Sequence, residues 1–195
     1  MNETKNGIST QSIVLSAILT AIVVLLQFMG SFIHLGPFSV SLVLLPIVIG
    51  AAICGVGTGA WLGLVFGFVV LLSGDASAFL AVNAPGTILT VLLKGLACGA
   101  VSGLVYKLIE PKNRYAATAA AAVVCPIVNT GIFLIGCFLF FMNTITEWAA
   151  GTGFGEDVGK YILFVIVGGN FLFEFILNIV ISPVIVRLIN IREKG

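Results

Sequence analysis

Long uncharged apolar runs dominate the chain and predict membrane-spanning helices. A helix needs about 20 apolar residues to cross the hydrocarbon core of a bilayer. One run, residues 38–72, carries no charge but is too long for a single span. Gly55 and Gly57 interrupt this run, and we expect them to end one helix and begin another. The pattern then predicts six spans, at residues 13–33, 38–53, 58–72, 87–109, 116–141 and 161–189.

The basic residues fall mainly on one side of this six-span arrangement. Seven of the nine lysines and arginines lie in the N-terminal tail, around the connection between the fourth and fifth spans, or at the C-terminal end. Cytoplasmic loops carry an excess of lysine and arginine. Both termini are therefore predicted to be cytoplasmic, with outer connections at residues 34–37, 74–86 and 142–160.

The composition strengthens this assignment and removes several classes of function. Hydrophobic residues make up 59% of the 195 residues, charged residues make up 9%, and the mean hydropathy is +1.21. A soluble domain has about 45–50% apolar and about 25% charged residues. A nucleic-acid binder, a cytosolic enzyme and a disulfide-stapled secreted domain are excluded on this ground. Short loops leave no room for a second soluble domain, so residues 1–195 are predicted to form one all-α transmembrane domain.

Catalytic and metal-binding patterns are missing from the sequence. The chain has one histidine, no H-E-x-x-H segment and no Walker A motif. Its four cysteines lie within apolar stretches without a C-x-x-C pair, and we expect them to be small buried apolar residues. We therefore expect no catalytic residue, no metal ion and no cofactor.

Glycines recur every four residues in two of the predicted spans. They are Gly59, Gly63 and Gly67 in the third span, and Gly95, Gly99 and Gly103 in the fourth. Small residues at this spacing let helix backbones approach closely in lipid. We expect them to pack helices within one molecule, with dimerisation as the alternative.

Two ionisable side chains lie inside predicted spans, where charge is costly and marks a candidate functional site. At 1.5 Å per residue, Lys94 lies roughly 10 Å from the outer end of the fourth span, and Glu174 roughly 20 Å from that of the sixth. Asn170 and Asn178 share a helix face with Glu174, because the three are spaced four residues apart. Asn129 adds an amide to the fifth span, three residues after Pro126.

Two interpretations of these polar groups stay open. In one, a polar cavity opens outward, Lys94 is its cationic anchor, and Asn129, Asn170 and Glu174 hydrogen-bond a small ligand. In the other, Lys94 and Glu174 neutralise each other within an interhelical hydrogen-bond network. For Asn178, membership of such a network is favoured over ligand binding. His34 and Trp148 lie in outer loops, where either would cover a ligand, although an interfacial aromatic belt explains Trp148 equally well.

Two segments and a small-residue pair carry a resemblance to a known family. Residues 35–51 read LGPFSVSLVLLPIVIGA, residues 55–67 read GVGTGAWLGLVFG, and Ala17 and Ala21 lie one helical turn apart in the first span. With six spans and cytoplasmic termini, the whole chain resembles the substrate-binding S component of an energy-coupling factor (ECF) transporter of the prokaryotic plasma membrane.

The resemblance implies a mechanism and assigns residues to it. Such a component captures a vitamin or related micronutrient from outside, docks on a transmembrane coupling protein with two ATPases, topples in the membrane and releases the ligand inward when ATP is used. Ala17 and Ala21 would contact the coupling protein. The ligand site would be lined by the last three helices and outer loops, which adds Asn83 and Trp148 to the intramembrane candidates, and residues 33–37 would form a gate.

The substrate and the class of transporter stay open in the sequence. A lysine in the site suits a carboxylate, as in pantothenate or folate, whereas neutral riboflavin would rely on aromatic rings and amides. A stand-alone ion- or proton-coupled carrier that uses Glu174 is the alternative function. A structural or assembly subunit of a membrane complex is a third.

Overall fold

The computed structural model of the chain describes residues 10–31, 34–35, 38–39, 42–155 and 157–194, with the backbone alone for residues 34–35, 38–39, 169–170 and 188–194. Its elements are α1 (Thr10–Gly30), β1 (His34–Leu35), β2 (Phe38–Ser39), α2 (Leu44–Cys54), α3 (Val56–Ser73), α4 (Ser77–Val82), α5 (Ala84–Ile109), α6 (Arg114–Phe140), α7 (Met142–Ala150), α8 (Val158–Tyr161), the π-helix η1 (Ile162–Gly168) and α9 (Gly169–Lys194).

Among the described residues, five helical segments are long and apolar enough to cross a membrane. They are α1, α3, α5, α6 and the continuous segment Val158–Arg187, which joins α8, η1 and most of α9. Each carries large apolar side chains that are more than half exposed, for example Leu25, Phe68, Leu108, Phe138 and Val180. A face of this kind is stable in lipid and unstable in water, so the chain is a multi-pass membrane protein, and its described residues form helices apart from one short hairpin.

The second predicted span differs from the prediction in its first half. Residues 38–53 were expected to form one helix, but Phe38–Ser39 pairs with His34–Leu35 as an antiparallel hairpin, and α2 begins only at Leu44. Residues 38–42 alternate between apolar and polar types, which is a strand period rather than a helix period. With 11 residues, α2 is about 16 Å long, too short to span the bilayer alone.

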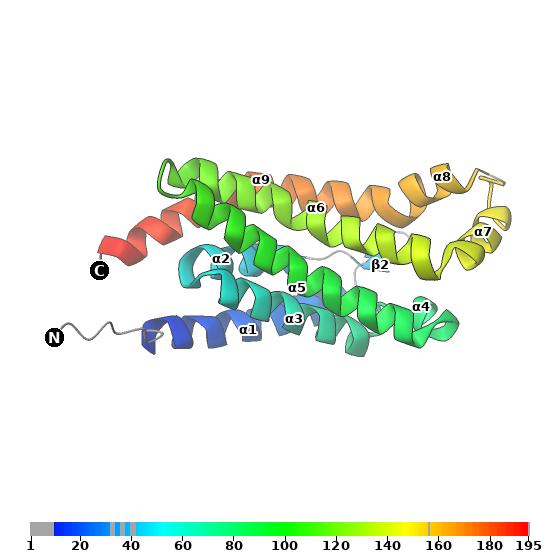
Figure 1. Ribbon diagram of the computed structural model, residues 1–195, viewed down its shortest axis with the longest axis horizontal. Coiled ribbons are helices and arrows are strands. Elements are labelled where there is room, and N and C mark those ends of the chain that lie inside the picture. Colours follow the sequence, from blue (N-terminus) through cyan, green and yellow to red (C-terminus); the bar gives the residue numbers. More distant parts are fainter. Residues whose placement is uncertain (1–9, 32–33, 36–37, 40–41, 156, 195) are drawn as a thin grey trace.

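The predicted break within residues 38–72 is confirmed. Gly55 separates α2 from α3 with a φ of 95°, a backbone conformation that residues with a Cβ atom rarely adopt. Within the described residues, five helices of membrane-spanning length and the shorter apolar α2 therefore result. Figure 1 shows α1 beginning and α9 ending at the left end of the long axis, where α5 also turns into α6, whereas α4 and α7 lie at the right end.

The glycine series packs α3 directly against α5, as predicted for contact within one molecule. A Cβ atom added to Gly63 would lie 1.9 Å from the carbonyl oxygen of Gly95, and one added to Gly95 would lie 2.2 Å from that of Gly63. One turn away, a Cβ on Gly99 would lie 1.9 Å from the carbonyl oxygen of Gly59. The two backbones are in van der Waals contact, so only glycine fits between them.

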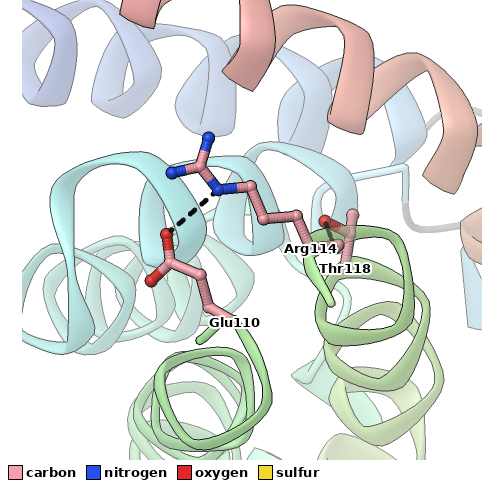
Figure 2. Close-up of polar contacts among 3 residues, drawn as sticks. All are labelled: Glu110, Arg114 and Thr118. Atoms are coloured by element: carbon pink, nitrogen blue, oxygen red, sulfur yellow. Dashed lines mark hydrogen bonds and ion pairs between the residues drawn. The ribbon is translucent and has the colours of Figure 1, made fainter. Parts of the chain in front are cut away.

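The turn between α5 and α6 is held by short-range polar contacts (Figure 2). Arg114 Nε lies 3.7 Å from Glu110 Oε1, and Thr118 Oγ1 donates a hydrogen bond of 3.0 Å to the Arg114 carbonyl. Asn113 caps α6 by accepting a hydrogen bond from the Ala116 amide at 3.1 Å. Partly exposed ion pairs contribute at most about 1 kcal/mol, so the cap and the short connection fix this turn more than its charges do.

We predict that Gly63→Ala lowers the free energy of unfolding by about 1–3 kcal/mol, because the added methyl group collides with backbone that cannot move aside. The matched control is Gly131→Ala in α6, where an added Cβ meets nothing within 4 Å. That control is expected to be neutral or stabilising by up to about 1 kcal/mol through helix propensity. Thermal unfolding in detergent measures both, and equal midpoints for the two variants would contradict the packing argument.

Candidate functional site

A cavity of about 100 Å³ lies among the helices, and α4 and the segment that joins it to α3 form part of its wall. A single water molecule needs only about 10–15 Å³ on this measure. Its lining side chains come from α1, α3, α4, α5, α6, η1 and α9. The cavity therefore has room for a small organic molecule, and nearly every long helix contributes to it.

Lys94 is the cation of this cavity. Its Nζ atom lies 5.6 Å from the ring centroid of Phe66 in α3 and 5.3 Å from that of Phe133 in α6. Aromatic faces attract a cation by about 0.5–2 kcal/mol, which is less than the cost of removing an ammonium group from water. An anion that entered the cavity would therefore find an ammonium group with incomplete compensation.

Glu174 and Asn129 lie in the same cavity wall. Glu174 is only 5% exposed and is within electrostatic reach of Lys94, but the structure shows no ion pair between the two side chains. Asn129 is 6% exposed, and its Oδ1 atom has no hydrogen-bond partner within the described part of the chain. An unsatisfied buried acceptor is costly, so the Asn129 amide is suited to hydrogen-bond a ligand.

The polar face of α5 extends toward α4 from Lys94. Thr87 and Thr90 line the cavity at helical spacings of three and four residues from one another and from Lys94. Asn83 fixes the start of this helix, because its Oδ1 accepts a hydrogen bond of 3.0 Å from the Gly86 amide. Asn83 thus caps the helix that carries the site and does not line the cavity.

A second polar group lies where α1 meets the segment that joins α3 to α4. Gln27 Nε2 donates a hydrogen bond to Asp75 Oδ2, and both residues line the cavity. Gln27 is 2% exposed, and its Oε1 atom has no hydrogen-bond partner among the described residues. The cavity thus has polar groups at two places, around Lys94 and around Gln27.

Aromatic rings close the cavity on the side of α4. The ring of Phe79 makes edge contacts with Phe133, Phe141 and Trp148, at centroid distances of 5.6, 4.9 and 5.5 Å. Trp148, in α7, packs behind Phe79 and is not part of the lining. Edge-to-face contacts of this kind are favourable, so Trp148 supports the wall from outside.

The π-helix η1 forms another part of the cavity wall. Ile166 and Val167 of η1 line the cavity, followed by Phe171 and Glu174 of α9. A π-helix has hydrogen bonds between residues five apart instead of four, and such segments are frequent at functional sites. At the start of the same span, outside the cavity, Lys160 Nζ lies 2.7 Å from Asp157 Oδ2, and this contact lowers the pKa of the exposed Asp157 carboxyl.

The structure places the predicted site residues in three groups. Lys94, Asn129 and Glu174 line one cavity, whereas Asn83 and Trp148 are not among its lining residues. The side chains of His34 and Asn170 lie outside the described residues, as do residues 33, 36 and 37 of the predicted gate. Asn178, 1% exposed, donates a hydrogen bond of 2.8 Å to the Glu174 carbonyl and is not among the residues that line the cavity.

Sequence reasoning did not select five polar residues of the cavity: Gln27, Asp75, Thr87, Thr90 and Thr130. Thr87 and Thr90 had a signal, since their spacing places them on the Lys94 face of one helix. The contact between Gln27 and Asp75 joins residues that are 48 positions apart, and no local pattern reveals it. Among the described residues, no cluster of histidine, cysteine or carboxylate side chains is suited to a metal ion.

Two comparisons with known proteins each match most of this chain. Residues 11–186 match the family model of the substrate-specific component of ECF transporters. The pantothenic acid transporter PanT of Lactococcus lactis subsp. cremoris (strain MG1363) is 30% identical over an alignment of 187 residues, and the alignment covers 87% of this chain and 89% of that protein. These matches confirm the resemblance that was inferred from residues 35–51 and 55–67.

We predict that a cysteine at Thr130, in the cavity wall, reacts with a small polar thiosulfonate reagent in a chain whose four native cysteines are replaced. The matched control is Ala121→Cys in the same helix, at a fully buried position outside the cavity. Thiol modification requires access, so Thr130→Cys is expected to react at least about tenfold faster. Equal labelling rates would contradict an accessible cavity.

Proposed function

This chain belongs to the substrate-specific components of ECF transporters, and we propose that it captures a carboxylate-bearing, water-soluble vitamin, pantothenate foremost, from outside the cell for ATP-driven uptake. As a member of a transporter family it is not an enzyme. The observation that carries the substrate class is the Lys94 ammonium group, which lines a cavity of suitable size and forms no ion pair with Glu174. A carboxylate ligand would complete this site through a charge-assisted hydrogen bond.

Pantothenate fits the proposal better than the other vitamins considered. The relative from Lactococcus lactis is named as a pantothenic acid transporter and aligns over most of both chains. Pantothenate also combines a carboxylate with an amide and two hydroxyl groups. The cavity offers one ammonium group together with amides and hydroxyls from Gln27, Asn129, Thr87 and Thr90, so each functional group of the ligand has a complementary type of partner.

The proposed energy source lies in separate proteins. Family membership implies a transmembrane coupling protein and two ATPases, and this chain has no nucleotide-binding motif of its own. Ala17 and Ala21 are both exposed on α1, so their methyl groups are available to a close-packing helix. We place both termini in the cytoplasm of a prokaryotic cell, since the basic turn between α5 and α6 lies at the end of the molecule where α1 begins and α9 ends (Figure 1).

We predict that Lys94→Met weakens pantothenate binding by at least about tenfold, because a charge-assisted contact to a desolvated carboxylate contributes about 1.5–3 kcal/mol. The matched control is Lys107→Met, which removes an exposed lysine from the other end of the same helix and should leave the Kd unchanged. Calorimetric titration of the purified protein measures both. A change of less than about threefold in the Lys94 variant would assign this lysine a structural role.

We predict that Ala17→Trp and Ala21→Trp abolish co-purification with the coupling protein and ATPases while the Kd for pantothenate stays at the wild-type value. The indole ring would hold the partner helix away from a surface that only small residues allow it to reach. Ile135→Trp on the exposed face of α6 is the control and should keep the complex intact.

Gradient-driven uptake by this chain alone in liposomes would contradict the proposal and favour an ion-coupled carrier that uses Glu174.

A further inference from the structure

The hydrogen bond between Gln27 and Asp75 leaves one polar atom of the Gln27 amide unpaired. Gln27 is almost fully buried, its Nε2 atom donates to Asp75, and its Oε1 atom has no partner among the described residues. Leaving a buried acceptor unpaired costs about 1–3 kcal/mol. Because Gln27 lines the cavity, a ligand that carries a hydrogen-bond donor would remove this cost.

The distance between the two polar places suits one elongated molecule. Phe66 packs against the Lys94 ammonium, and Asp75 follows the end of α3 at Ser73. The seven-residue rise from Phe66 to Ser73 separates the two places by roughly 10 Å along the helix axis. Eight bonds join the carboxyl carbon of pantothenate to its terminal hydroxyl, and a chain of that length extends over roughly 9 Å at peptide dimensions.

Charge determines which end of the molecule goes where. A carboxylate is attracted to the ammonium of Lys94 and repelled by the carboxylate of Asp75. Hydroxyl groups both donate and accept hydrogen bonds, so they suit the carboxylate of Asp75 and the free acceptor of Gln27. An acid with hydroxyl groups at its far end would satisfy both places at once.

We propose that Gln27 and Asp75 bind the hydroxyl groups of the substrate and make the protein selective for hydroxylated acids over otherwise identical acids without hydroxyls. This inference rests on the proposed function, since it takes Lys94 as the carboxylate anchor. It assigns a specificity role to a residue of the first helix, which the sequence resemblance connects only with the coupling protein.

The test compares two ligands on the full-length purified protein by calorimetric titration. One ligand is pantothenate, and the other is N-(3,3-dimethylbutanoyl)-β-alanine, which keeps the carboxylate, the amide and the methyl groups but has hydrogen in place of both hydroxyls. The wild-type protein is expected to prefer pantothenate by at least about tenfold, because the second ligand leaves buried polar groups unpaired.

Gln27→Met keeps the approximate size of the side chain and removes its amide. It should reduce the preference to below about threefold by weakening pantothenate alone, because only pantothenate uses that amide. Asp75→Ala removes the same contact from the other side and is the second variant should Gln27→Met fold poorly. Gln11→Met, an exposed glutamine of the same helix, is the control and should keep the wild-type preference.

The possible failures are distinguishable. If the wild-type protein binds neither ligand, the proposed function is wrong and this inference fails with it. If the wild-type protein binds both ligands equally, or if Gln27→Met and Asp75→Ala keep the preference, the inference alone is wrong and the carboxylate anchor stands. An equal loss of affinity for both ligands would assign Gln27 and Asp75 a structural role.

Discussion

The backbone contact between α3 and α5 is the constraint on which the site depends. Gly63 and Gly95 bring each carbonyl oxygen against the other helix, so α5 cannot rotate about its axis without a collision. Successive residues of a helix differ in direction by about 100°. Lys94 is therefore turned away from the helix contact and reaches the space between Phe66 and Phe133. The glycines that pack α3 against α5 thus also orient Lys94, the one cationic side chain among the described residues that line the cavity.

The two aromatic rings beside Lys94 compensate only part of the free energy that is lost when its ammonium group leaves water. Each aromatic ring attracts the ammonium group by about 0.5–2 kcal/mol. Removing an ammonium group from water costs several kcal/mol. Rigid packing between α3 and α5 supplies the stability that keeps such a group in place, since lipid provides no hydrophobic drive between helices. The glycine contact thus holds the Lys94 ammonium in the cavity although the two rings compensate its charge only in part.

The sequence predicted the parts of this structure that follow from local chemistry. The break at Gly55, the glycine contact and the presence of polar groups at Lys94, Asn129 and Glu174 all depend on residue type and helical spacing. Other features depend on tertiary contacts or on irregular backbone. The π-helix has no apolar period of its own, because residues 161–168 are apolar or glycine throughout. The hairpin before α2 was missed because hydropathy over a long window hid an alternating pattern of five residues.

Polar contacts, rather than apolar burial, attach α1 to the other helices. This helix buries only a narrow stripe, at Leu19, Val23, Gln27 and Gly30, and the share of its apolar window that is buried is 22%. Hydrogen bonds to α3 supplement that stripe, from Trp61 Nε1 to Thr20 Oγ1 at 3.2 Å and between Ser16 and Thr58 at 3.3 Å, and the Gln27–Asp75 contact holds its other end. In a bilayer such bonds contribute about 0.6–2 kcal/mol each. Since apolar burial gains little there, a few polar contacts hold α1 in place and leave most of its surface free for lipid or a partner helix.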